Sequence, residues 1–460
     1  MLSSPRLWFW VCVALVGVRL LWPLDIPFIY DEPELIARAL ALNAQNEWAV
    51  HGLQGTRGAA YGPLPLWFYQ AALFWTTDLA VVAMGKALVL SLLSLWSVWT
   101  LVGVLKPKAV WIAVVPFLSL YLWVYARDLW DNSFLTGFSA VVCAAYLRFI
   151  VDKSKRWFAL ALLACALCLQ IHLMCLPWVG AIAMHLLVFR RAWLRANLGF
   201  VAGVFAVGAA SLYPYLQYLL GTPSAPVRFA LRPASFFFAL YGGREFSAIA
   251  AEYFFGNLWF LQGPWFLQGV GALAVGLTLF AFVPVFYGMW VCAKTRQREL
   301  HWFLTLWLVL HVLVIGANQL VSHPYYYNAA WLGFFAFFCI GWEALPASVR
   351  WKAAGRLYVG GLAVSFAFGI VQVHWNSGNR ELHFGTVLGN LWEVAEQRAC
   401  FPVETPVDAT GIESRFGAGF QTLRHLVRCP SGPQKASQLF LRYARPSDTR
   451  EGKVVLVPMN

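Results

Sequence analysis

Long apolar segments recur along the whole chain, and they constrain its fold more than any other feature. Residues 79–105 and 196–213, for example, contain almost no charged side chain. A helix of about 20 apolar residues is long enough to cross a bilayer, whereas the strands of a membrane barrel alternate polar and apolar residues. Hydrophobic residues make up 60% of the chain and charged residues only 12%, which is far from a soluble composition. The sequence therefore predicts an all-α polytopic membrane protein.

Short basic segments separate the apolar runs and indicate the topology. Cytoplasmic loops carry an excess of lysine and arginine. All the basic segments share one side of the membrane if the chain crosses about eleven times with its N-terminus in the cytoplasm. They also explain the net charge of +13, so no nucleic-acid partner is expected. We expect a bacterial inner-membrane protein with a periplasmic C-terminus. The segments are residues 106–108, 152–156, 190–195, 294–298 and 350–356.

Three stretches outside the apolar runs are expected on the external face. The first external loop, 25–78, holds an amphipathic segment and a proline-aromatic segment, which we expect to be helices at the membrane surface. A second long external loop is expected at 214–264. Residues 1–374 then form one transmembrane domain. The tail, 375–460, mixes both charge signs, glycine and strand-like residues, which predicts a small external α+β domain.

Two of the nine cysteines, Cys400 and Cys429, lie in this tail. Disulfides persist on the oxidising side of a membrane, so we expect a bond between these two residues. Two free, buried thiols are the alternative. The other cysteines lie in or beside apolar runs, where they are expected to be small core residues.

Two adjacent carboxylates, Asp31 and Glu32, follow the first apolar run on the external face. Carboxylates at a membrane boundary are costly unless they have a function or face water. Neighbouring carboxylates near a low-dielectric boundary raise one pKa, which suits a general base. The alternative is a helix cap: Asp31 would cap a helix that begins at Pro33, and Glu34 would complete a capping box. The sequence leaves both interpretations open.

The next polar loop on this face contains a basic residue and two acidic ones. The forked donors of Arg127 suit a phosphate, and the alternative is a pair with Asp131 across one helical turn. Asp128 is adjacent and is a further acidic candidate. No metal is predicted as a requirement, but Asp31, Glu32 and Asp131 offer the oxygen ligands that a divalent cation prefers.

Further candidates lie in other external segments. His172, near the end of an apolar run, is expected to be a hydrogen-bonded core residue, with a role beside the acceptor as the alternative. Arg228 and Arg244 in the long loop suit a lipid phosphate. His323 and Tyr325 are candidates for contact with the acceptor, and an interfacial aromatic belt is the alternative.

Four segments, taken in order, carry a resemblance to a known family. They are Tyr30-Asp31-Glu32, Gly62-Pro63-Leu64-Pro65-Leu66-Trp67-Phe68, Ala126 to Leu135, and Leu169-Gln170-Ile171-His172-Leu173. The pattern resembles the membrane glycosyltransferases with the GT-C fold, in the branch of the protein O-mannosyltransferases and the lipid A aminoarabinose transferase. The second segment departs from the His-Pro-Pro run of the family, which leaves the sugar and the acceptor open.

The resemblance implies an inverting glycosyltransferase that moves a sugar from a polyprenyl-phosphate donor to a hydroxyl of an external acceptor. That acceptor is lipid A, another glycolipid, a polysaccharide or a protein. Asp31 would be the base, with Glu32 as its neighbour or substitute, and Arg127 would neutralise the departing phosphate. Asp131 and His172 would lie beside the reacting groups or on the acceptor side. The alternatives are a polyprenyl-linked lipid flippase or transporter and an inactive scaffold.

Overall fold

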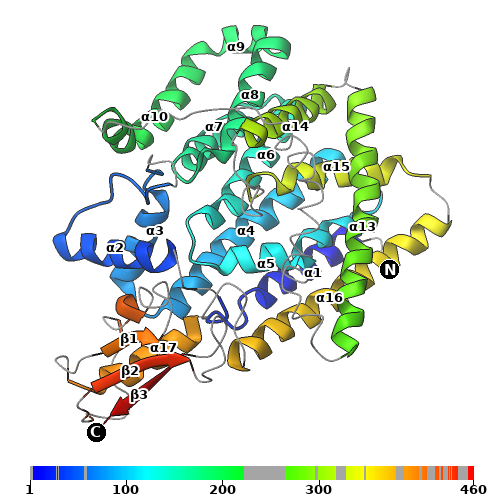
Figure 1. The fold of residues 1–460 in the computed structure, drawn as a ribbon. Helices are drawn as coiled ribbons and strands as arrows, with labels where there is room; N and C mark the ends of the chain where they lie inside the picture. The colour runs from blue at the N-terminus through cyan, green and yellow to red at the C-terminus, as the bar shows by residue number, and fades with distance from the viewer. Residues whose placement is uncertain are drawn as a thin grey trace.

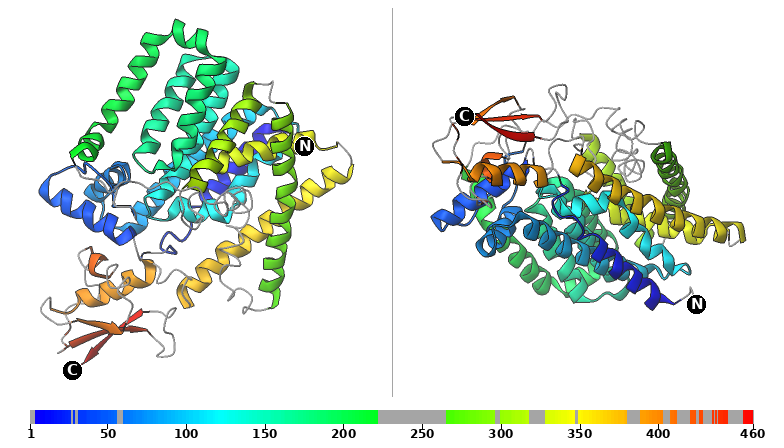
Figure 2. Two further views of the ribbon diagram at one scale, coloured as in Figure 1. Left: turned by 45° about the horizontal axis from the view of Figure 1, so that its top comes forward. Right: turned by 90° about the horizontal axis from the view of Figure 1, so that it is seen from below.

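Helices make up most of the described structure, which confirms the predicted all-α class (Figure 1). Three strands lie near the C-terminus, beside the helices of the first external loop in the views of Figures 1 and 2. The computed structural model of the chain describes residues 4–26, 28, 31–55, 60–221, 265–295, 299–317, 328–346, 349–379, 388–402, 407–411, 420–423, 426–427, 434, 436, 438–443 and 454–459.

Each predicted transmembrane run contains helix. Four described helices are long and apolar enough by themselves to cross a membrane, and a bent pair, η1 with α5, would make a fifth. The count of eleven spans therefore stays a prediction. The elements are α1 (Pro5–Val18), α4 (Leu79–Leu105), η1 (Val110–Leu118), α5 (Leu120–Arg127), α6 (Leu135–Asp152), α7 (Lys155–Leu169), α8 (Leu176–Phe189), α10 (Leu198–Gly221), α13 (Trp265–Lys294), α14 (Glu299–Ala317), α15 (Trp331–Ala344) and α16 (Val349–Asn379), with the short helices η2 (Asn132–Phe134), η3 (Leu173–Cys175) and α9 (Arg191–Ala196) between them.

Helix α4 shows how local sequence sets these boundaries. The Asp78 side chain accepts a hydrogen bond from the backbone N–H of Ala80 at 2.8 Å, which caps the N-terminus of the helix. Lys106 ends the helix in the left-handed conformation, with a φ of 48°, and Pro107 follows. The apolar run between these ends fixes the place of its one charged residue, Lys86, in the interior of the bundle.

The third apolar run is broken, so the prediction of one continuous helix was wrong there. Pro116 lies inside the 3-10 helix η1, and proline cannot donate a backbone hydrogen bond. Ser119 then starts α5, because its hydroxyl accepts from the N–H of Leu122 at 3.4 Å. The two helices differ in direction by 58°. The break places the end of α5, and Arg127 with it, beside the first external loop.

Three other boundaries differ from the sequence-based expectation. Helix α10 continues through Pro214 to Gly221, so the predicted loop 214–264 is seen to begin later, and residues 222–264 lie outside the described residues. Helix α7 ends at Leu169, which leaves His172 outside it. Helix α16 crosses the expected domain boundary at residue 374 and ends at Asn379.

The first external loop folds into two helices, α2 (Asp31–Gln45) and α3 (Leu64–Trp75). These are the helices that its amphipathic and proline-aromatic segments predict. Gln70 of α3 joins them, because its backbone carbonyl accepts from the side chain of Asn43 in α2 at 2.9 Å and its own side chain donates to Asn43 Oδ1 at 3.3 Å. The pair is thus held as one unit, with the acidic segment at its N-terminal end.

The C-terminal elements pack against this same loop. The N–H of Leu388 donates to the carbonyl of Ile26 at 2.8 Å, and the N–H of Gly389 donates to Leu24 at 3.1 Å. Cys400 is disulfide-bonded, and its expected partner, Cys429, lies outside the described residues. The elements are α17 (Leu388–Ala399) and a sheet of order β1 (Val407–Gly411), β2 (Gln438–Tyr443), β3 (Val454–Met459), in which β2 is parallel to β1 and antiparallel to β3.

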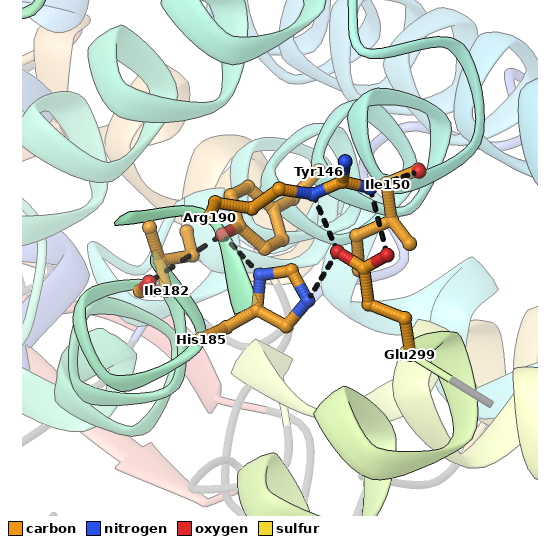
Figure 3. Close-up of polar contacts among 6 residues, drawn as sticks. All are labelled: Tyr146, Ile150, Ile182, His185, Arg190 and Glu299. Atoms are coloured by element: carbon orange, nitrogen blue, oxygen red, sulfur yellow. Dashed lines mark hydrogen bonds and ion pairs between the residues drawn. The ribbon is translucent and has the colours of Figure 1, made fainter. Parts of the chain in front are cut away.

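A buried polar cluster joins α6, α8 and α14 at the end of the bundle where α9 lies (Figures 1 and 3). Arg190 contacts both carboxylate oxygens of Glu299, at 2.5 and 2.8 Å. His185 lies between Glu299, 3.1 Å from its Nε2, and the hydroxyl of Tyr146, 2.9 Å from its Nδ1. The polar groups of this cluster contact one another, which indicates that it holds three helices together.

Replacing Glu299 with glutamine is expected to lower the free energy of unfolding by about 1–3 kcal/mol, because Arg190 keeps a largely buried charge without its carboxylate. The measurement is the thermal midpoint of the purified protein in detergent. Asp152→Asn is the control: it removes the exposed Arg148–Asp152 pair, also an Arg–carboxylate contact, at 2.6 Å. Exposed pairs contribute less than about 1 kcal/mol. Equal midpoints for the two variants would contradict a stabilising role of the cluster.

Candidate active site

Asp31 begins helix α2 and meets a tryptophan from a distant part of the chain. The indole Nε1–H of Trp130, in the loop between α5 and η2, donates to Asp31 Oδ2 at 2.6 Å. Helix α2 begins at Asp31 itself and not at Pro33. The described hydrogen bond of the carboxylate therefore comes from a side chain, and not from the backbone of its own first turn. The helix start thus differs from the capping interpretation, which placed Asp31 before a helix that begins at Pro33.

The surroundings of Asp31 alter its acidity. Burial raises the pKa of the Asp31 carboxyl above its ordinary value, and the indole N–H of Trp130 opposes this rise. Burial disfavours the charged form, and a donor to the carboxylate favours it. A general base works best when its pKa lies near the working pH. The raised pKa is thus in the direction that a base at neutral pH needs.

Three further carboxyl groups lie around Asp31. Glu32, Asp128 and Asp131 are almost fully buried, and Asp128 shares a hydrogen bond with Glu32. Burial raises the pKa of Asp131 to about 7, and the nearby Asp31 carboxylate adds to this rise. Burial also raises the pKa of Asp128, against the opposing charge of Lys86. Like charges in a buried site do not all ionise together, so the group holds protons near neutral pH.

Lys86, for which no role was predicted, lies beneath this acidic loop. Its side chain is fully buried in α4. The Nζ donates to the carbonyls of Asp128 and Trp130, the latter at 3.1 Å, and to the hydroxyl of Ser133. A single lysine in an apolar run was the signal, because an intramembrane charge usually has a partner. Lys86 fixes the loop that carries Trp130.

Arg127 faces the loop after α1. Its Nη1 donates to the carbonyls of Leu21 and Trp22, both at 2.8 Å, and its Nη2 donates to the carbonyl of Asp25 at 3.1 Å. The guanidinium also lies over the ring of Trp123. Because α5 ends at Arg127, the predicted pairing with Asp131 across one helical turn was wrong. The described contacts give Arg127 a positioning role, and phosphate binding by Arg127 stays a prediction.

The loop that Arg127 holds has a second anchor that sequence reasoning missed. His374, in the last turns of α16, places its Nδ1 2.7 Å from Asp25 Oδ2. Its ring stacks on Trp22 with 4.0 Å between centroids. The loop between α1 and the acidic segment is thus held from two sides, by α5 and by α16.

His172 caps the short helix η3, because its Nδ1 accepts from the N–H of Met174 at 3.1 Å. Burial lowers the pKa of His172 to about 4, so the ring is neutral at neutral pH. Tyr61 packs on it at 4.6 Å between centroids. The next residue, Gly62, lies so close to Gln170 that an added Cβ would come within 2.4 Å of its Cα. Two of the four resembling segments therefore pack directly on each other.

Several predicted residues lie outside the described structure: Arg228, Arg244, His323 and Tyr325. Among the residues that are described, no group of three or more histidine, cysteine, aspartate or glutamate side chains is arranged to hold a metal ion. The alternative ligand set of Asp31, Glu32 and Asp131 thus does not converge in this structure.

The fold and the two acidic loops define a polytopic α-helical membrane protein with the GT-C fold. Solved structures with the same fold are those of ArnT from Cupriavidus metallidurans, a lipid A aminoarabinose transferase, bound to undecaprenyl phosphate and in the apo state. Each has a TM-score of 0.56 and 13% sequence identity over 95% of this chain and 93% of the other. This likeness confirms the predicted fold. No protein-family model and no curated protein sequence matches the chain.

Proposed function

We propose that this protein is an inverting glycosyltransferase that moves a sugar from a polyprenyl-phosphate donor to a hydroxyl of an external acceptor. The observation that carries the proposal is the Asp31 carboxylate, held by Trp130 at 2.6 Å among three other carboxyl groups. The chain shares its fold with ArnT, one structure of which binds undecaprenyl phosphate. We place the protein in a bacterial inner membrane, crossing it eleven times, with a cytoplasmic N-terminus and a periplasmic active site and C-terminus.

In the proposed reaction, Asp31 takes the proton of the acceptor hydroxyl. The oxygen then bonds to the anomeric carbon while the bond from that carbon to the lipid phosphate oxygen breaks. The phosphate leaves as an anion with the electron pair, and the proton stays on the Asp31 carboxyl. Attack on the face opposite the departing phosphate inverts the anomeric carbon. Positioned proton transfer of this kind accelerates reactions by about 10²–10⁴-fold.

The remaining residues divide between donor and acceptor. We propose Arg127, Arg228 and Arg244 for the donor phosphate, because forked guanidinium donors match phosphate oxygens. His323 and Tyr325 are proposed on the acceptor side. The acceptor is lipid A, another glycolipid, a polysaccharide or a protein.

A polyprenyl-linked lipid flippase or transporter is the second candidate. The observation that favours it is the 58° break between η1 and α5, because transporters build substrate sites at broken helices. In this protein, however, a backbone group at the break already has a partner. Arg19, at the end of α1, donates to the carbonyl of Pro116 at 2.7 Å. Because this carbonyl is already hydrogen-bonded within the protein, we prefer the enzyme to the transporter.

The test is sugar transfer by the purified chain in proteoliposomes. Labelled polyprenyl-phosphate donors with hexose or pentose sugars are offered with each class of acceptor, with and without a chelator. The expected result is a labelled product with inverted anomeric configuration. If the donors instead cross the bilayer without losing their sugar, the protein is a transporter. An inactive scaffold is indicated if neither transfer nor crossing occurs.

A further inference from the structure

We propose that Trp130 is a positioning residue for Asp31, whose indole N–H orients the carboxylate and favours its ionised form. The inference rests on the proposed function in so far as Asp31 is the base. The contact itself is a property of the fold, and it joins residues 99 positions apart in the chain. The same contact links the two acidic loops, which come from α2 and from the segment after α5.

The first step of the argument is the geometry of the contact. A tryptophan side chain has one hydrogen-bond donor and no acceptor, so its indole forms hydrogen bonds only with acceptor atoms. An ionised carboxylate has acceptors and no donor, and its oxygens are stronger acceptors than those of the protonated group. The 2.6 Å contact from Trp130 Nε1 to Asp31 Oδ2 is short for a bond from nitrogen, as charge-assisted bonds are. It therefore suits the ionised form of Asp31.

The second step is how Trp130 is held. Its carbonyl accepts from Lys86 Nζ at 3.1 Å and from the hydroxyl of Ser133. Its ring stacks with Tyr125 at 6.5 Å between centroids. Backbone and ring are thus fixed from α4, from η2 and from α5. A donor that is fixed before the reaction needs no reorganisation when charge develops.

The third step is the balance of charge at Asp31. Glu32 and Glu34 share its helical turn. Asp131 interacts with it from the loop after α5. Lys86 and Tyr69 of α3 lie near Glu32, Asp128 and Asp131. Burial favours a protonated Asp31. Trp130 is the described hydrogen-bond donor to that carboxylate and acts in the opposite sense.

The experiment measures the protonation of Asp31 without any transfer reaction. An apolar carbodiimide reacts with protonated carboxyl groups, and fragment-ion mass spectrometry assigns the adduct to Asp31 and not to Glu32. The labelling midpoint is the pH at which half of Asp31 is labelled. In Trp130→Phe this midpoint is expected to rise by about one pH unit, which matches the loss of one hydrogen bond to a charged group. An unchanged midpoint in that variant would overturn the inference.

Trp67→Phe is the matched control. Trp67 is half-buried like Trp130, but its Nε1–H donates to the backbone carbonyl of Ala49 at 2.7 Å. This variant also loses an indole hydrogen bond, and the Asp31 midpoint is expected to stay at its wild-type value. If the Asp31 midpoint rises equally in both tryptophan variants, the loss of any nearby indole hydrogen bond raises it. That result would refute a specific role of Trp130. Where Trp130→Phe does not fold, Ser133→Ala is used, with a smaller upward shift expected.

Transfer assays of the same variants separate the inference from the proposed function. If the wild type is active, the acid limb of the pH–rate profile is expected to lie at higher pH in Trp130→Phe than in the wild type, by the same amount as the labelling midpoint. At high pH the rate of the variant is expected to be largely recovered. A protein that has lost general structure would not regain its rate at high pH. If the wild type transfers nothing, the proposed function fails, and the labelling result still decides the role of Trp130.

Discussion

Asp31→Asn is expected to lower the rate constant of sugar transfer by about 10²–10⁴-fold, because asparagine cannot take a proton from the acceptor hydroxyl. The substitution keeps the size and shape of the side chain, and its amide oxygen still accepts from Trp130 Nε1. The fold and the binding of the donor are therefore expected to survive. The measurement is transfer of label from the polyprenyl-phosphate donor in proteoliposomes, with kcat and KM determined separately.

The dependence of the wild-type rate on pH gives a second signature of this base. Burial raises the pKa of the Asp31 carboxyl, and the base acts only when it is ionised. Activity is thus expected to be full above that raised pKa and to fall as the pH drops through it. The residual activity of Asp31→Asn is expected to lack this acid limb.

Asp78→Asn is the matched control for this variant. Asp78 lies in the same external loop, is exposed, and caps helix α4. Asparagine caps helices about as well as aspartate, so the same chemical change is expected to leave transfer near the wild-type level. If Asp31→Asn transfers sugar as fast as Asp78→Asn, then Asp31 is not the base, and Glu32 and Asp131 become the candidates.

The parts of the structure that the sequence predicted depend on local patterns. Apolar length located the helices, as for α4, whose bounds agree with the predicted run at 79–105. The same logic found α2 and α3, because amphipathic spacing and prolines act over a few residues. The acidic pair at Asp31 was found because charge is rare at a membrane boundary.

The parts that were missed depend on contacts between distant residues. No local signal joins Trp130 to Asp31 or Lys86 to the carbonyl of Asp128. Arg127 donates to backbone carbonyls about 100 residues earlier in the chain, which no local pattern predicted. Backbone carbonyls are present at every residue, so the sequence does not mark which of them an arginine will meet.

The broken third run shows a different limit. Hydropathy is averaged over a window and does not register one missing N–H, although Pro116 was visible in the sequence. Proline is tolerated in membrane helices where neighbours satisfy the freed carbonyls. The carbonyl freed by Pro116 in this 3-10 helix is that of Ala113, and the thiol of Cys12 in α1 donates to it at 3.6 Å. That compensation is again a contact over a long stretch of chain, and it determines where Arg127 and the second acidic loop lie.

Lys86→Met is expected to lower the free energy of unfolding by about 3–5 kcal/mol, the cost of breaking a buried charge pair by removing one partner. Methionine keeps the length of the side chain but leaves the carbonyls of Asp128 and Trp130 without their donor, and three carboxyl groups without their nearby cation. The measurement is the denaturation midpoint in detergent. Lys106→Met, an exposed change at the C-terminal end of the same helix, is the control and is expected to be within about 0.5 kcal/mol of the wild type.

The pH dependence of this loss separates charge from packing. Without the ammonium group, the carboxyl groups of Glu32, Asp128 and Asp131 lose the attraction that offsets their mutual repulsion wherever they are ionised. A carboxyl whose pKa is raised on folding destabilises the folded state above its unfolded pKa, and this penalty vanishes when it is protonated. Burial raises the pKa of Asp131 to about 7, so the deficit of Lys86→Met is expected to be larger at pH 8 than at pH 5. A deficit that is the same at both pH values would mean that Lys86 acts through its hydrogen bonds to the carbonyls of Asp128 and Trp130, and that the acidic loop does not depend on its charge.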